Sequence, residues 1–288
     1  MRIVDYLRLM DEIHASNLVC ASCGAVVYTT LINANESFCN FCESYVTKES
    51  LNSVNANSDI ERTMQGMQNA AKDYKWEKGV PFADALAATK NPMLLYGAST
   101  YYKAFSDFVY SDVDYTQGGF MYSNADNRSD EQLKNKYNAM ALISKSKEYL
   151  FKTLKITSAN ASPGPQTLYL RVMSNIKLKR YRNAATEMIE LNSAKEGATL
   201  SKYARMVFDM ETTDHAKNAI KPPDVDDALG SANLFYYYAK YLAKKKDFGS
   251  AIYVLSNLTE KVLMPMASYY TDYLRNISAA SGLSHAAR

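Results

Sequence analysis

The four cysteines of this 288-residue chain fall into two pairs, each with two residues between the thiols. Cys20 and Cys23 form the first pair and are followed by Gly24, and Cys39 and Cys42 form the second. A two-residue spacing lets one tight turn direct both sulfurs at one ion, and two such turns complete the tetrahedral four-thiolate shell that Zn²⁺ prefers. A glycine after a pair suits the left-handed residue that closes such a turn. We therefore predict a structural zinc site with all four cysteines as its ligands.

Other chemistries of the same residues are less favoured. A mononuclear iron site uses the same four thiolates and stays open as an alternative. A thioredoxin-type redox pair needs one cysteine pair at a helix N-terminus in a βαβ setting, which the sequence does not predict. Catalytic zinc usually has three protein ligands and an open position, whereas four thiolates close the shell. His14 lies six residues before Cys20 on a helical pattern, and we interpret it as a surface residue.

The cysteine pairs bracket the β-branched and aromatic run VVYTTLI, which is typical of a strand. Over residues 18–47 the pattern resembles a zinc ribbon, a small module in which β-hairpins carry the two cysteine pairs. The resemblance implies Cys20, Cys23, Cys39 and Cys42 as zinc ligands. Residues 1–50 hold three basic and six acidic residues, a net charge of −3. Because phosphate contacts dominate nucleic-acid affinity, this charge disfavours a nucleic-acid role for the module.

The flanks of this module are predicted from apolar spacing and from polar composition. Residues 1–16 have the three- and four-residue apolar spacing of a short amphipathic helix. We assign residues 1–50 to this helix and the zinc ribbon. Residues 51–60 are rich in Asn and Ser and are predicted to be a linker. Residues 61–288 are predicted to form one α-helical body.

Within the body, prolines and polar stretches divide the helical pattern. Pro81 and Pro92 are each predicted to begin a helix, because proline fits the first turn. Residues 111–130 are predicted to be a long polar loop, followed by a helix from about 130 to 156. A break is expected at residues 161–166.

Two segments of the body align with each other, residues 168–191 and residues 235–258. In each, an apolar helix runs into lysine-rich polar residues, then an aromatic residue and an alanine three residues later, Ala184 and Ala251. The two alanines are separated by almost two periods of about 34 residues each. This pattern resembles the tetratricopeptide repeat, a 34-residue helix–turn–helix unit. The resemblance implies repeat-like helix pairs over about 165–265, and the predicted fold is mainly α, with stacked antiparallel helices and a small N-terminal β zinc ribbon.

Composition and charge exclude several classes. The chain is 47% hydrophobic and 22% charged, which excludes a collagen, a disulfide-dense secreted scaffold and a fully disordered protein. The net charge of +3 is too small to indicate a nucleic-acid or membrane partner. Charged residues interrupt the N-terminal apolar stretch, and no run reaches the roughly 18 residues of a membrane span. We therefore expect a soluble, cytoplasmic protein with no membrane partner.

Aromatic and basic residues gather near the C-terminus. Of the 23 tyrosines, several lie over residues 236–273. We expect them to pack between helices, with an aromatic interaction surface as the alternative. Residues 165–288 carry 17 basic and 12 acidic residues, a net charge of +5. Lys244, Lys245 and Lys246 form the one basic run there, which we interpret as a solvated turn between helices.

The sequence favours a non-enzymatic function. The chain has three histidines and lacks the common nucleophile, phosphate-loop and metalloprotease motifs. We expect a protein-interaction, scaffold or assembly protein with a structural Zn²⁺ site and one or more protein partners, up to a larger assembly. The alternative is a nucleic-acid-associated or transcription-related factor that uses the zinc ribbon.

Overall fold

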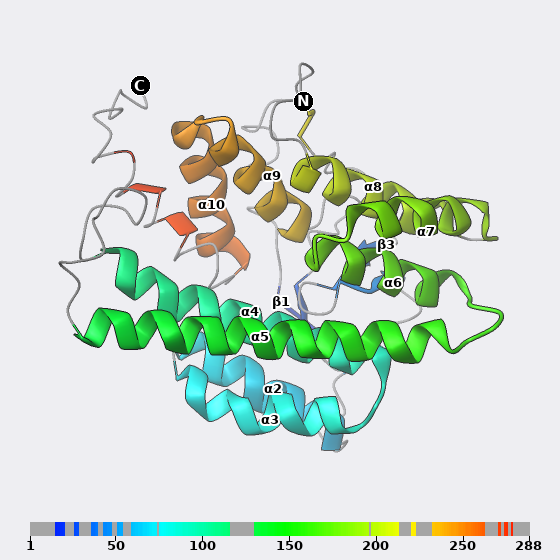
Figure 1. Ribbon diagram of the computed structural model, residues 1–288, viewed down its shortest axis with the longest axis horizontal. Helices are drawn as coiled ribbons and strands as arrows, with labels where there is room; N and C mark the ends of the chain where they lie inside the picture. Colours follow the sequence, from blue (N-terminus) through cyan, green and yellow to red (C-terminus); the bar gives the residue numbers. More distant parts are fainter. Residues whose placement is uncertain are drawn as a thin grey trace.

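The computed structural model describes most of the helical body and short parts of the N-terminal region. The described residues are 15–20, 26–28, 36–39, 43–47, 51–53, 59–73, 75–115, 130–195, 197–212, 220–222, 232–262, 270–271, 274–275 and 278. Within them the chain is mainly α-helical, with nine helices and five short strands (Figure 1). No helix among these residues combines the length and the apolar character that crossing a membrane requires.

The helices follow one another along the chain and pack as neighbours. They are α2 (Asp59–Lys72), α3 (Trp76–Ala88), α4 (Pro92–Tyr115), α5 (Asp130–Ser158), α6 (Pro165–Lys177), α7 (Tyr181–Ser193), α8 (Ala198–Thr212), α9 (Ala232–Lys244) and α10 (Phe248–Val262). Each contacts the next, and α6 also contacts α4 and α8. A mainly α body of stacked helices is thereby confirmed for the described part of the chain.

The N-terminal strands form two small antiparallel sheets. In the first, β1 (Ala15–Cys20) lies between β2 (Val26–Tyr28) and β5 (Leu51–Ser53). In the second, β3 (Glu36–Phe38) pairs with β4 (Tyr45–Thr47). Figure 1 shows β1 beside α4 and β3 beside α6 in the view, and Phe38 and Cys39 pack in the cores of the body. This part of the module is therefore enclosed by the body and does not hang from its end.

Four sequence predictions need correction. Residues 15–16 belong to β1, because Ala15 pairs with Tyr28, and the rest of the predicted helix 1–16 lies outside the described residues. The predicted linker 51–60 begins with β5, which pairs with β1, and ends in α2. Pro81 lies inside α3, because the buried indole of Trp76 holds an earlier turn. The predicted loop 111–130 starts later, because α4 continues to residue 115.

The two halves of the body have separate hydrophobic cores. One core lies mainly among α6 to α10 and also includes Tyr96 of α4 and Leu150 of α5, and the other lies among α2 to α5 and includes Trp76 and Leu86. Phe38 belongs to the first core, whereas its neighbour Cys39 belongs to the second. Two consecutive residues of the N-terminal module therefore connect the two cores.

In the helix pairs α6–α7 and α9–α10, the first helix ends in the same type of turn. Lys179 has φ 59° and Lys246 has φ 62°, and the two lysines occupy equivalent positions in the two aligned segments. The N–H of the following residue returns to the carbonyl of Asn175 in one pair and of Leu242 in the other, at 2.8 and 3.0 Å. The sequence alignment thus corresponds to two hairpins with the same turn.

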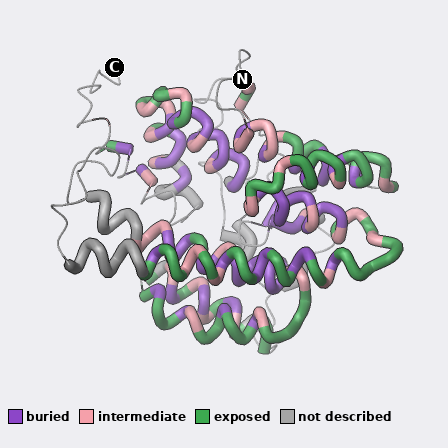
Figure 2. The backbone as a smooth tube through the Cα atoms, viewed as in Figure 1, coloured by how far each residue is buried: buried purple, intermediate pink, exposed green. Residues whose placement is uncertain are grey.

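The first helix of each hairpin is the more buried one. Figure 2 shows α6 and α9 largely buried, whereas α7 carries exposed residues along its outer side. Helices α6, α8 and α9 begin at residues 165, 198 and 232, so successive starts follow a period of about 34 residues. A helix that is buried on most sides has other elements packed against both of its faces. The N-terminal module is one of these elements.

Candidate metal centre

The second cysteine pair begins a turn whose two ends are hydrogen-bonded to each other. The Cys39 N–H donates to the Ser44 carbonyl at 2.8 Å, and the Glu43 N–H donates to the Cys39 carbonyl at 2.9 Å. Glu43 has φ 57°, in the left-handed region that glycine usually occupies. We call Cys39, Glu43 and Ser44 the cysteine turn. Glu43 follows the second pair as Gly24 follows the first, and Gly24, for which the left-handed conformation was predicted, lies outside the described residues.

Two of the four predicted ligands lie close to this turn. Cys20 ends β1, Cys39 follows β3, and both are buried in the same core. The Cys20 sulfur lies 3.1 Å from the Ser44 hydroxyl, so the first cysteine pair begins beside the turn of the second.

The other two predicted ligands, Cys23 and Cys42, lie outside the described residues. Among the described ones no group of three or more His, Cys, Asp or Glu is positioned to hold a metal. The donor set is nevertheless compatible with zinc, because Cys20 and Cys39 are buried thiols and Cys20 lies beside the turn that begins at Cys39.

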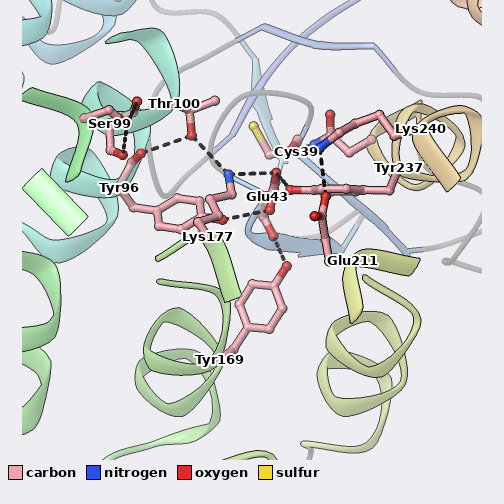
Figure 3. Close-up of polar contacts among 12 residues, drawn as sticks. Cys39, Glu43, Tyr96, Ser99, Thr100, Tyr169, Lys177, Glu211, Tyr237 and Lys240 are labelled. Carbon is pink, nitrogen blue, oxygen red and sulfur yellow. Dashed lines mark hydrogen bonds and ion pairs between the residues drawn. The ribbon is translucent and has the colours of Figure 1, made fainter. Parts of the chain in front are cut away.

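Glu43 directs its carboxylate away from the strands and into the helices (Figure 3). Its side chain is buried, with the residue 4% exposed. The Tyr96 hydroxyl of α4 donates to Oε2 at 2.8 Å, and the Tyr237 hydroxyl of α9 donates to Oε1 at 3.2 Å. The Lys177 ammonium of α6 forms an ion pair with Oε1 at 3.1 Å. We call Glu43, Tyr96, Lys177 and Tyr237 the Glu43 network.

The backbone of the cysteine turn is bound by the same helices. The Tyr169 hydroxyl of α6 donates to the Glu43 carbonyl at 2.9 Å. The Asn233 amide of α9 donates to the Cys39 carbonyl at 3.2 Å. A buried backbone carbonyl without a hydrogen bond is energetically costly. These donors from α6 and α9 therefore stabilise the cysteine turn.

The network holds its tyrosines in the neutral form. Burial, and then the Glu43 carboxylate, raise the pKa of Tyr96 and of Tyr237 well above the usual value. Both hydroxyls therefore remain protonated and donate to the carboxylate. The Lys177 ammonium also lies 4.4 Å from the centre of the Tyr96 ring, a cation–π arrangement. One buried negative charge thus has a cation and two neutral donors around it, which offsets the cost of its desolvation.

Phe38 packs the end of β3, the strand before the cysteine turn, against the helical body. Its ring stacks on Tyr203 of α8 with centroids 4.0 Å apart and lies 6.0 Å from Tyr169. It also contacts Tyr45, its partner across the β3–β4 pair, at 5.6 Å. The strand before the cysteine turn is therefore fixed by aromatic packing, and the turn itself by polar contacts.

Sequence reasoning did not identify Glu43 or Lys177, which were counted only as charges. The available signal was the residue after the second cysteine pair. Gly24 fills this position in the first pair, whereas an acidic residue fills it in the second. A non-glycine residue that must adopt a left-handed conformation needs compensating contacts, and this requirement distinguishes Glu43 from the other acidic residues of the module.

The C-terminal tyrosines and lysines behave partly as expected. Tyr237, Tyr238 and Tyr241 are buried between helices, as predicted. Lys244 is not simply solvated, because its ammonium donates to the carbonyls of Met210 and Glu211 at the end of α8. A cation at a helix C-terminus is favourable.

A second candidate site lies away from the cysteines. A groove of about 580 Å³ is lined mainly by apolar and aromatic side chains of α4 and α5, with Glu77 and Lys145 as charged residues. Beside it, Tyr102 and Tyr149 both donate to Asp84. All three histidines, which the sequence did not assign to a site, lie outside the described residues.

Comparisons with protein families, with curated proteins and with solved structures find no match to this chain. Its function is therefore inferred from the contacts of its own residues.

Proposed function

We propose that this chain is a non-enzymatic protein-interaction or scaffold protein whose N-terminal module holds one structural zinc ion. The observation that supports this most directly is the pair of equivalent hairpins, α6–α7 and α9–α10, with the same left-handed lysine at the turn. Together with helix starts that follow a period of about 34 residues, it supports a degenerate tetratricopeptide-like repeat. Such stacks present extended surfaces that suit protein assembly.

The outer helices are the proposed contact surface. The cysteine turn covers the inner sides of α6 and α9, so a partner has better access to the second helices of the hairpins. Ile189 on α7 is 70% exposed, and Tyr253 on α10 is also exposed. In this proposal the partner is one or more proteins, up to a larger assembly, in the cytoplasm, where thiols stay reduced and can bind a metal.

The contacts of the lysines favour a protein partner over the nucleic-acid alternative. Lys177 is paired with Glu43, and Lys240 and Lys244 are paired with Glu211. These cations are therefore partly neutralised within the fold. Since nucleic-acid affinity depends on cations that can reach phosphates, their engagement supports the scaffold function.

The partner test compares surface variants of the full chain. The wild-type chain should co-elute from its native extract with a protein at fixed stoichiometry. Ile189→Asp should lose that protein, and Met140→Asp on α5, also at an exposed position, should retain it. A chain that elutes alone, or one that binds DNA or RNA at about 50 mM salt, would overturn the proposal.

The metal test measures content and identity. Purified wild-type chain should contain one equivalent of zinc, and Cys39→Ser should lower the content or the affinity. One equivalent of iron would assign the site to the alternative metal. Unchanged affinity in Cys39→Ser would show that the ligand assignment is wrong.

A further inference from the structure

We propose that Glu43 is a positioning residue through which metal binding at the cysteines and packing of the helical body stabilise each other. This inference rests on the proposed zinc site and goes beyond it, because it assigns a function to the buried carboxylate beside that site. The Glu43 network would make the two halves of the body respond to zinc.

The conformation of Glu43 is the first support. Its φ of 57° is a left-handed conformation, which suits the residue that closes a turn after a cysteine pair. The same conformation sends the carboxylate to Tyr96, Lys177 and Tyr237. One backbone geometry therefore serves both the turn and the network, so a change in either affects the other.

The position of the turn between the two cores is the second support. Tyr96 belongs to α4 but its side chain packs in the core of α6 to α10, and Lys177 and Tyr237 are on α6 and α9. Cys39 is packed in the core of α2 to α5, and Phe38 is packed in the core of α6 to α10. A rearrangement of the cysteine turn would therefore disturb contacts with both halves at once.

Loss of the metal would remove one of the constraints that hold the turn in this geometry. A turn that rearranged would leave Lys177 without its ion pair and both tyrosines without their acceptor. Coupling between two sites is reciprocal: if zinc favours the assembled network, the network must favour zinc by the same factor. Breaking the network should therefore weaken zinc binding even though no cysteine is changed.

The experiment measures zinc affinity of the full chain by competition with a chelating indicator. Glu43→Gln and Tyr237→Phe are the test variants, since each removes one member of the network and keeps a similar shape. We expect each to weaken zinc affinity about 10-fold or more, the usual effect of losing a group that orients metal ligands. Tyr96→Phe provides a third variant should Glu43→Gln fail to fold.

Two control variants remove similar contacts made by residues that are not members of the Glu43 network. Glu211→Gln removes a partly buried carboxylate that pairs with Lys240 between α8 and α9. Tyr102→Phe removes a hydroxyl that donates to Asp84 in the other half of the body. Both should keep wild-type zinc affinity, even where they lower stability.

Each outcome decides between the two proposals. One equivalent of zinc with unchanged affinity in the test variants overturns the coupling and leaves the zinc site intact. Equal weakening in test and control variants also overturns it, because the effect would then be general destabilisation. A wild-type chain that binds no zinc overturns both the site and the coupling.

Discussion

The Tyr96 hydroxyl donates a 2.8 Å hydrogen bond to the Glu43 carboxylate, 53 residues earlier in the chain. This bond joins the cysteine turn to α4, while Lys177 and Tyr237 join it to α6 and α9. The N-terminal module is consequently part of the packing of the body. Its removal or rearrangement should be measurable in the stability of helices that lie far from it in sequence.

Phe38→Ala should destabilise the whole body. The side chain is 0% exposed and stacks on Tyr203, so its loss removes core packing between the module and α8. A buried Phe→Ala change costs about 3–5 kcal/mol. Urea unfolding followed by the helical signal should show this loss, and Phe151→Ala, at a 52% exposed position, should change stability by less than about 1 kcal/mol. A small effect of Phe38→Ala would mean that the module does not stabilise the helices.

Glu43→Gly separates backbone strain from side-chain contacts. Glycine relieves the left-handed conformation by about 1 kcal/mol. It also leaves the Lys177 ammonium without its carboxylate and the buried hydroxyls of Tyr96 and Tyr237 without an acceptor, at about 1–3 kcal/mol each. We expect net destabilisation by about 2 kcal/mol or more in urea unfolding. Stabilisation by Glu43→Gly would instead mean that strain outweighs the network.

The helices were largely predictable from the sequence, whereas the position of the module was not. Apolar spacing and proline positions predicted α4 and α5 closely, because both features act within a few residues. The start of α3 was missed because Trp76 is held by Tyr101 and Phe105, which belong to the next helix, α4. Contacts between separate helices produce no periodic pattern in the sequence around the residue whose position they determine.

Gly79→Ala should destabilise the chain although alanine favours helices. A Cβ at Gly79 would lie 1.9 Å from the Tyr101 hydroxyl, which donates to the Trp76 carbonyl at 2.7 Å. We expect a loss of about 2 kcal/mol from overpacking and the broken bond. Gly249→Ala in α10 meets nothing within 4 Å and should instead stabilise by up to about 1 kcal/mol. Thermal unfolding of the two variants in parallel tests this contrast.

Stability should fall as the pH rises above about 10. Burial, and then hydrogen bonding to Asp84, raise the pKa of Tyr102 and of Tyr149 above the ordinary value of 10.0. A raised pKa in the folded state means that these hydroxyls stabilise the fold fully below about pH 10 and lose that contribution as the pH increases further. Urea unfolding at about pH 9 and pH 11 should show the decrease, and Tyr102→Phe should reduce it. Equal pH dependence in wild type and Tyr102→Phe would contradict this assignment.

The proposed ligands of the candidate site could be named from the sequence, whereas the surroundings of Glu43 could not. Two-residue cysteine spacing is a local pattern that indicates metal binding without knowledge of the fold. Cys20 and Cys39 could therefore be proposed as ligands from the sequence. The partners of Glu43 come from helices 53 to 194 residues away, and their residue types are common on ordinary helix surfaces. Lys177 and Tyr237 therefore had no distinguishing feature until the helices were placed around the turn.

Thermal unfolding of the full chain with and without zinc, followed by the helical signal, tests the central claim most directly. Helices should still form without the metal, because each half of the body has its own core. The midpoint should nevertheless fall by about 10 °C after chelation and recover when zinc is restored, as expected for a tightly bound ion that stabilises the folded chain. Identical midpoints for the zinc-loaded and zinc-free chains would contradict the claim that the cysteine turn holds the two halves of the body together.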